Sequence, residues 1–359
     1  MYTIITTYPN ERSRNVGDKL IFSSAIDILK KEKGEENFLV FFREDNLSSK
    51  LSLINQSRAV ILPGFPLRKE MNSLYWIFEH LDKIFVPVIP MGSGWGSFPG
   101  DFLDIEKFRF SDSTKAFLKK ISDNVPLFAC RDVHTQIILE KIGVNSTIFT
   151  GDCGLFNFNF IGKKIKVGNV ENVVFTPPHK SMYFHQAKEI LEFISMFFPD
   201  AMKYFSLHSV ISKNDKKLIE YSKDLDFHVI DCAGNLTKLE MYNSMDLHIG
   251  YRLHGHISFL SRNKPSILLC EDGRSIGFHA SFNIGTFIAF KRHKSCNFLG
   301  NIFGNKKPDA IIVDDKITQK LHNFLLNQKM SGFFEYKRVP YIISDLYTEN
   351  MKAFLNTIP

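Results

Sequence analysis

The segment HIGYRLHGHISF, residues 248–259, places an arginine, three histidines and two glycines between two apolar stretches. We expect a strand before the turn and a helix after it, and a helix N-terminus offers free N–H groups and partial positive charge to a ligand. Arg252 and His254 are two residues apart, so they would project to one side of an extended turn. Arginine suits a carboxylate or phosphate, and histidine exchanges protons near neutral pH. The pair therefore predicts an anion site at which a proton moves.

Each of these side chains also has an ordinary structural alternative. His254 can cap the helix, and Arg252 can form a surface ion pair. We expect His248 and His256 to make structural hydrogen bonds. No carboxylate or thiolate pattern accompanies the three histidines on one face, so we expect no metal site.

The glycine-rich segment PMGSGWGSFPG, residues 90–100, is a second candidate because it directly follows an apolar, strand-like run. Gly92, Ser93 and Gly94 would bring backbone N–H groups close to an oxyanion. The G-K-[ST] ending of a Walker A loop is absent, so the segment is not a loop of that kind. The sequence thus predicts an oxyanion-binding loop after this strand.

Three further side chains lie at the ends of predicted strands or the starts of predicted helices. Asp18 opens the amphipathic helix of NVGDKLIFSSAI, Arg131 ends PLFACR, and Arg274 follows the strand in LLCEDGR. The carboxyl ends of parallel strands form ligand crevices, so we expect these side chains to face one cleft. For Asp18 the alternative is a helix cap.

Strand-like and helical runs alternate along the chain, which is typical of parallel sheets flanked by helices. The predicted strands are 3–6, 38–42, 59–63, 86–91, 126–131, 173–178, 201–209, 227–232, 246–250 and 265–270. The predicted helices are 19–33, 72–84, 111–122, 133–143, 181–198, 214–225 and 236–245.

A stretch rich in Gly, Asn and Lys at 156–172 interrupts this alternation and is typical of a linker. We therefore predict the α/β class, with two Rossmann-like domains facing across a cleft. The N-terminal domain would span 1–165 and the C-terminal domain 173–330. Helical periodicity in the tail predicts a helix within 340–359 that packs back on the N-terminal domain.

Composition limits the classes of function. Of 359 residues, 44% are hydrophobic and 23% charged, which supplies packed cores and argues against disorder. The formal net charge of +7 suits an anionic small molecule, an acidic membrane surface or nucleic acid, and a lysine-rich solvated surface is the alternative. We expect no nucleic-acid partner, because Lys and Glu alternate along helices and most Phe lie in apolar runs.

Cysteine usage and hydropathy predict the compartment. The five cysteines are widely spaced and form no CxxC pair, so neither a disulfide framework nor a zinc knuckle is indicated. No basic leader precedes the short apolar start, and no stretch approaches the roughly 20 apolar residues that span a bilayer. We expect a cytoplasmic protein, with at most peripheral contact with the inner face of the membrane.

Several of these motifs occur together in a known order. NVGDKL, PMGSGWG, CRDVHTQIILEKIGV, TGDCG and YRLHGHISFLSRNKPSILLCEDGR lie over residues 15–280 and resemble the polysaccharide pyruvyl transferase family. The R-L-H turn, the following P-x-x-x-L and the acidic/arginine loop are the most specific part. The resemblance implies a GT-B-like fold, with the acceptor side and part of the donor site in the N-terminal domain and the donor side in the C-terminal domain.

The resemblance also implies a reaction. The enzyme would move the pyruvyl group of phosphoenolpyruvate onto two hydroxyls of a sugar, forming a ketal and releasing phosphate. The acceptor would be a surface polysaccharide, such as an exopolysaccharide or capsule, or its lipid-linked precursor. Phosphoenolpyruvate is then a co-substrate, and we expect neither a cofactor nor a metal.

Site residues follow from the same resemblance. The family's catalytic histidine maps to His254 and its basic donor-binding positions map to Arg131 and Arg252. Some members have lysine where this chain has Arg274, which we assign to anion binding because arginine is a poor proton donor. Asp18 would orient or deprotonate an acceptor hydroxyl.

Two alternative functions use the same features. A GT-B glycosyltransferase would hold the diphosphate of a nucleotide sugar in the same cleft, and fold analogy alone does not separate the two enzymes. A non-catalytic polyanion-binding protein would need basic residues and stacking aromatics clustered on one face, which the sequence does not indicate.

Overall fold

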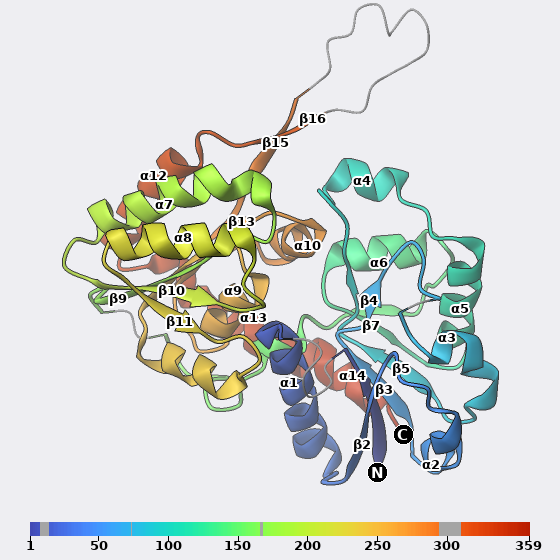
Figure 1. The fold of residues 1–359 in the computed structure, drawn as a ribbon. Coiled ribbons are helices and arrows are strands. Elements are labelled where there is room, and N and C mark those ends of the chain that lie inside the picture. The colour runs from blue at the N-terminus through green and yellow to red at the C-terminus, as the bar shows by residue number, and fades with distance from the viewer. Residues whose placement is uncertain (8–13, 73, 166–167, 294–309) are drawn as a thin grey trace, which may run out of the picture.

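The computed structural model describes residues 1–7, 14–72, 74–165, 168–293 and 310–359. Two α/β domains lie side by side, each built around a parallel sheet (Figure 1). The predicted pair of Rossmann-like domains is confirmed.

The N-terminal sheet has the order β2-β1-β3-β5, with all pairs parallel. A bridge between Ser93 and Cys130 continues it to the parallel pair β7-β8, and β4 and β6 form a separate short pair. The strands are β1 Tyr2–Thr6, β2 Phe38–Phe42, β3 Val60–Pro63, β4 Pro66–Leu67, β5 Val88–Met91, β6 Gly94–Trp95, β7 Phe128–Cys130 and β8 Thr147–Phe149.

Helices flank this sheet (Figure 1). They are α1 Val16–Lys33, α2 Leu51–Asn55, α3 Ile77–His80, α4 Phe102–Lys107, α5 Asp112–Ser122 and α6 Val133–Glu140, with 3-10 turns η1 Ser48–Lys50, η2 Leu81–Lys83 and η3 Cys153–Leu155. The Asn15 side chain caps α1 by accepting a hydrogen bond from the Gly17 N–H, and Gly34 ends the helix in the left-handed conformation.

The C-terminal sheet has six parallel strands in the order β11-β10-β9-β12-β13-β14, which is the Rossmann order 3-2-1-4-5-6. The strands are β9 Asn172–Thr176, β10 Met202–Leu207, β11 Phe227–Asp231, β12 Leu247–Gly250, β13 Ser266–Cys270 and β14 Thr286–Ile288. The helices are η4 Ser181–Tyr183, α7 Phe184–Phe197, α8 Lys213–Asp224, η5 Leu236–Ser244, α9 Leu253–Leu260, α10 Gly273–Phe282 and α12 Ile317–Ser331. The antiparallel strand pair β15 Phe290–His293 and β16 Ala310–Val313 projects from this domain (Figure 1).

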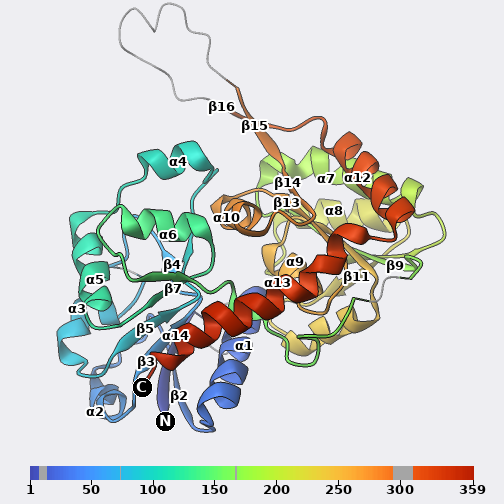
Figure 2. The same cartoon turned by 180° about the vertical axis from the view of Figure 1, so that it is seen from behind.

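The C-terminal segment crosses from the C-terminal domain to the N-terminal domain (Figure 2). It consists of η6 Phe334–Arg338, α13 Val339–Asp345, the π-helical turn Leu346–Met351 and α14 Lys352–Asn356. Tyr347 Oη donates a 2.6 Å hydrogen bond to the Glu32 carboxylate, and Lys33 Nζ donates one of 2.6 Å to the Ile358 carbonyl. These bonds tie the end of the chain to α1.

Three further contacts fix how the domains face each other. Val16, the first residue of α1, is buried among C-terminal-domain side chains, and its N–H donates to the His208 carbonyl at 2.9 Å. Beside α10, the Gly273 N–H donates to the Ser97 carbonyl at 2.9 Å. The Arg292 guanidinium also pairs with Asp104 at 2.8 Å.

Two predicted helices are wrong in type or extent. Among the described residues of 72–84, only those of α3 and η2 are helical, because Tyr75 is buried in the core and the Trp76 N–H donates to the Arg43 carbonyl. In place of the helix predicted at 236–245, Leu236–Ser244 form the 3-10 helix η5, which suits the three-residue spacing of buried Leu239 and Tyr242.

The described cysteines are all buried and unpaired, as expected for small core residues. Cys296 lies outside the described residues. Among the helices of the described chain, none combines the length and apolar character needed to cross a bilayer.

We expect Gly100→Ala to disturb the contact between the domains. A Cβ at Gly100 would lie 2.3 Å from Gly273 Cα, and the residue has a φ of +75°. Gly34 is the matched control, because its φ is +61° and nothing lies within 4 Å of an added Cβ. In urea unfolding, Gly34→Ala should cost about 1 kcal/mol and Gly100→Ala about 2–4 kcal/mol. Equal losses would contradict a tight contact at this point.

Candidate active site

The candidate site is a cavity of about 390 Å³ at the carboxyl ends of strands from both domains. In each sheet the strand order reverses next to the cleft, between β1 and β3 and between β9 and β12, and ligands of open parallel sheets bind at such points. The cavity brings together five predicted residues: Asp18, Gly94, Arg131, His254 and Arg274.

His254 lies in the first turn of α9 and faces a carboxylate of the other domain, Asp152. Its Nε2 is 3.4 Å from Asp152 Oδ2, and Arg131 Nη1 is 3.7 Å from the same oxygen. All three side chains are buried. Burial alone would raise the pKa of Asp152, but His254, Arg131 and the Gly154 N–H bring it below its usual value. Asp152 is therefore an ionised carboxylate that holds an imidazole beside a guanidinium.

Polar atoms of this cluster are unsatisfied. Among the described residues, Arg131 Nε and Nη2, Asp152 Oδ2 and His254 Nε2 have no hydrogen-bond partner although they are buried. Buried polar atoms are nearly always hydrogen-bonded, and exceptions commonly mark catalytic groups or bound water. Because Arg131 and His254 line the cavity, the cluster can bind an anion and exchange a proton with it.

Arg274 and Arg68 add two guanidinium groups to the cavity wall. Arg274 Nη2 is 2.6 Å from Asp272 Oδ2, the N-cap of α10. Burial opposes ionisation of Asp272, yet Arg274 brings the pKa of Asp272 down to about 2. Burial and the nearby Arg274 charge lower the pKa of Arg68. The two cations are thus close enough to repel, and an anion between them would remove that repulsion.

Arg252 lines a narrow recess that adjoins the main cavity at Asn15, His254 and Arg274. Its Nε donates to the Pro177 carbonyl at 2.8 Å, and its Nη1 contacts the His179 ring.

The recess also contains His179 and Glu271, which lie beside Arg252. Burial and the Arg252 charge lower the pKa of His179 to about 3, so His179 is a neutral acceptor. Glu271 accepts hydrogen bonds from the His179 and Lys180 N–H groups, and burial raises the pKa of Glu271 to about 7.

The glycine-rich segment has a different role from the predicted one. The Ser93 N–H donates to the Ala129 carbonyl at 2.8 Å and the Gly94 N–H to the Phe65 carbonyl at 3.0 Å, so neither is available to an oxyanion. Gly92 packs against Gly151 and Cys153 and does not line the cavity.

Two glycines of this segment instead make room for guanidinium groups. A Cβ at Gly94 would lie 2.2 Å from Arg131 Nη2, and one at Gly96 would lie 3.0 Å from Arg68 Nη1. The two residues are two apart, so they present the same side of the extended chain.

The N-terminus of α1 forms the opposite wall. Asn15 is its cap, which leaves Asp18 in the first turn, lining the cavity. A Cβ at Gly17 would lie 2.2 Å from His254 Nδ1, so only glycine allows α1 to approach this ring.

The other two histidines of the opening motif are structural, as expected. His248 hydrogen-bonds Thr176 and Ser266, and His256 hydrogen-bonds Ser266, all at 2.7–2.8 Å within the core. In the part of the chain that the structure describes, no three His, Cys, Asp or Glu side chains are grouped to hold a metal ion.

Asp152, His179 and Arg68 were not predicted from the sequence. Asp152 follows the three-residue strand β8 in TGDCG and meets a partner about a hundred residues away. His179 follows β9 in PPHK, and Arg68 follows β4. Their positions after strands could have identified both as candidate site residues.

Solved GT-B-type structures resemble the whole chain. MnaA of S. aureus, solved with UDP, has a TM-score of 0.54 at 12% identity and covers 99% of this chain and 97% of its own. HepE of Anabaena, solved with UDP and glucose, has a TM-score of 0.55 at 11% identity and covers 99% and 98%. A putative UDP-N-acetylglucosamine 2-epimerase of Listeria monocytogenes has a TM-score of 0.56 at 10% identity and covers 97% and 93%. At these identities the likeness shows the fold, and the chain is a GT-B-type protein.

The sequence profile described as polysaccharide pyruvyl transferase matches residues 15–270. This chain therefore belongs to the polysaccharide pyruvyl transferase family and is a transferase of polysaccharide biosynthesis. No curated protein matches the sequence.

We expect the loss of stability caused by Asp152→Asn to depend on pH, because the substitution removes an ionised carboxylate. The folded-state pKa of Asp152 is below its unfolded value of about 3.9, so its ionisation adds stability above about pH 4 that is lost as pH falls further. The variant should be about 3 kcal/mol less stable at pH 7, and its deficit should shrink at pH 3.5 in chemical denaturation.

The matched control is Asp132→Asn, because burial raises the pKa of that carboxyl. Its ionisation lowers stability as pH rises, so the difference between wild type and this variant should change with pH in the opposite direction. The same pH trend in both variants would contradict the assignment.

Proposed function

We propose that this chain transfers the pyruvyl group of phosphoenolpyruvate to two hydroxyls of a sugar in a surface polysaccharide or its lipid-linked precursor, forming a pyruvate ketal and releasing phosphate. The observation that carries the proposal is the cluster of unsatisfied buried polar atoms on Arg131, Asp152 and His254, which adjoins a cavity with further guanidinium groups. Family membership supports pyruvyl transfer, and the donor is our inference.

The donor has a carboxylate and a phosphate, so it needs several fixed cations. Arg131, Arg274 and Arg68 supply three at the cavity wall, and Arg252 adds one in the adjoining recess. Guanidinium groups bind both kinds of anion in a fixed, bidentate geometry. These contacts orient the enol ester with its double bond toward His254.

The reaction needs one proton carrier. A proton added to the methylene carbon of the donor makes it a methyl group and leaves positive charge on the carbon that bears the phosphate. A sugar hydroxyl adds to that carbon and loses its proton, the carbon–oxygen bond to phosphate breaks, and a second hydroxyl closes the ketal. The two sugar hydroxyls release two protons: one replaces the proton that the methylene carbon took up, and the other leaves with phosphate. His254 carries the proton, and Asp152 orients its ring. Asp18 orients the attacking hydroxyl.

A nucleotide-sugar glycosyltransferase is the second candidate, because two structures that share the fold were solved with UDP. A diphosphate would use the same arginines. The two candidates differ in the stabilising ligand: phosphoenolpyruvate for the first, and a UDP, GDP or CMP sugar for the second.

We expect His254→Ala to reduce phosphate release from phosphoenolpyruvate by about a thousandfold, because it removes the proton carrier. Asp152→Asn should reduce kcat about 10–100-fold. The exposed His228, on β11, is the control, and His228→Ala should match wild type. The assay uses a panel of acceptor glycans, mass analysis for the added ketal, and excess chelator, in which activity should persist.

Three outcomes would contradict the proposal. His254→Ala could turn over near the wild-type rate, or chelator could abolish activity. Alternatively, a nucleotide sugar but not phosphoenolpyruvate could raise Tm, with no phosphate released.

We also propose peripheral contact with an acidic membrane through an aromatic surface formed by Met330, Phe334, Lys337, Arg338 and Tyr341. Met330, Phe334 and Tyr341 are 80%, 70% and 59% exposed, respectively. Lys337 Nζ lies 5.8 Å from the Phe334 ring centroid. Exposed aromatics with adjacent cations are typical of surfaces that bind anionic lipid, and a lipid-linked acceptor would be found there.

We expect Phe334→Ser/Tyr341→Ser to release the protein from phosphatidylglycerol vesicles in sedimentation at low salt, because it removes the rings that insert among lipids. Phe85, 83% exposed in the N-terminal domain, gives the control Phe85→Ser, which should still sediment. Equal sedimentation of both variants, or no wild-type sedimentation, would contradict this surface.

A further inference from the structure

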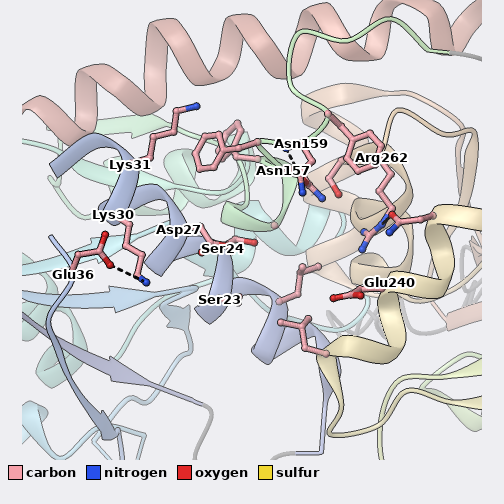
Figure 3. Close-up of a pocket in the computed structure, with 18 residues that line it drawn as sticks. Ser23, Ser24, Asp27, Lys30, Lys31, Glu36, Asn157, Asn159, Glu240 and Arg262 are labelled. Atoms are coloured by element: carbon pink, nitrogen blue, oxygen red, sulfur yellow. Dashed lines mark hydrogen bonds and ion pairs between the residues drawn. The ribbon is translucent and has the colours of Figure 1, made fainter. Parts of the chain in front are cut away.

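A second cavity, of about 800 Å³, lies between the domains on the other face of α1 (Figure 3). We name it the α1 groove. Its walls are α1, the segment 156–160, and η5 with the residues after α9. On α1, Asn15, Asp18 and Ile21 line the candidate active site, whereas Ser23, Ser24, Asp27 and Lys31 line the groove. The two cavities are therefore separate.

The groove contains side chains whose polar groups are free. Ser23, Ser24 and Asp27 line it from α1, and Asn159 and Glu240 line it from the other walls (Figure 3). Within the described part of the chain, none of these five side chains forms a hydrogen bond or ion pair. Hydroxyl and amide groups both donate and accept, whereas carboxylates accept only. This set fits a ligand with many hydroxyl groups.

The cations of the groove are already engaged. Lys30 pairs with Glu36 at 3.2 Å, and Lys31 lies 3.9 Å from the Phe158 ring centroid. Arg262 donates to Asn243 Oδ1, the Ser258 carbonyl and hydroxyl, and the Leu239 carbonyl. The two other carboxylates, Asp27 and Glu240, interact electrostatically with Lys30 and Arg262, respectively. Together with Glu36 they balance Lys30, Lys31 and Arg262, so the groove has no excess positive charge to attract phosphate or nucleotide ligands.

The segment FNFNF, residues 156–160, gives the groove apolar surface beside these polar groups. Phe156, Phe158 and Phe160 all line it, between Asn157 and Asn159. Asn157 Oδ1 accepts a 3.0 Å hydrogen bond from the Asn159 N–H, which fixes the turn. Pockets for small ligands combine apolar walls with a few placed polar groups, and a pyranose has both C–H faces and hydroxyl edges.

We propose that the α1 groove binds a neutral oligosaccharide, namely a part of the acceptor chain remote from the sugar that reacts. That the ligand belongs to the acceptor rests on the proposed function. That the groove takes a neutral saccharide rests on its own side chains. Its position between the domains lets one ligand contact both, through Ser24 and Asp27 on one side and Glu240 on the other.

Saturation-transfer NMR and calorimetric titration with neutral trisaccharides of glucose, galactose or N-acetylglucosamine test the groove directly. At least one should bind wild type, and Asp27→Ala/Glu240→Ala should weaken it at least tenfold, because two acceptors of hydroxyl protons are lost. The control is Glu220→Ala/Asp224→Ala, which removes the same charge from exposed positions on α8 and should bind as wild type. His254→Ala should also bind as wild type, since the active site is a separate cavity.

The inference is overturned if no trisaccharide binds, if the groove variant binds as tightly as wild type, or if only His254→Ala loses binding. A second readout compares acceptors of one and several repeat units. The groove variant should raise KM at least threefold for the longer acceptor and leave the shorter one unchanged. If phosphate release fails for every protein, the proposed function is wrong, while the titration still decides the groove.

Discussion

The ionised carboxylate of Asp152 is the constraint on which the rest of the cleft depends. It is enclosed by protein, so it needs cationic or donating neighbours, and these come from both domains: Arg131 beside it and His254 across the cleft. Loss of either partner would leave Asp152 as an uncompensated buried charge, which costs far more than loss of an exposed ion pair. The position of the imidazole is therefore coupled to the contact between the domains.

The fold maintains that contact at several points around the cleft. α1 begins at Val16 inside the C-terminal domain, and Gly17 lets its backbone lie against the His254 ring. On another side, Gly100 and Gly273 bring two backbones together, closer than side chains would permit. The C-terminal helix then joins the cores of both domains through residues such as Met351. Small residues lie where the domains meet most closely, because a Cβ there would push them apart.

Site residues that directly follow strands of the parallel sheets could be predicted from the sequence, because the topology alone places them at one edge of the sheet. Arg131, His254 and Arg274 were predicted on this basis, and all three line the same cavity. The sequence did not predict Asp152, since the role of that carboxylate depends on a packing partner in the other domain. It also misassigned the amides of Ser93 and Gly94, because a glycine-rich pattern does not tell whether its N–H groups are already bonded. Likewise, apolar spacing in 72–84 predicted a helix where burial of individual rings decided the path.

The arrangement divides two tasks between residue types. Arginines supply fixed charge, and Arg274 cannot act as an acid because it is held by Asp272. His179 is neutral, with a pKa of about 3, and Glu271 directs its oxygens to backbone N–H groups outside the main cavity. That leaves His254, backed by an ionised carboxylate, as the group able to take a proton and return it at one point of the cavity. The proposed donor, a multiply charged enol ester, would need both kinds of group at once, and the facing strand ends of the two domains bring them together.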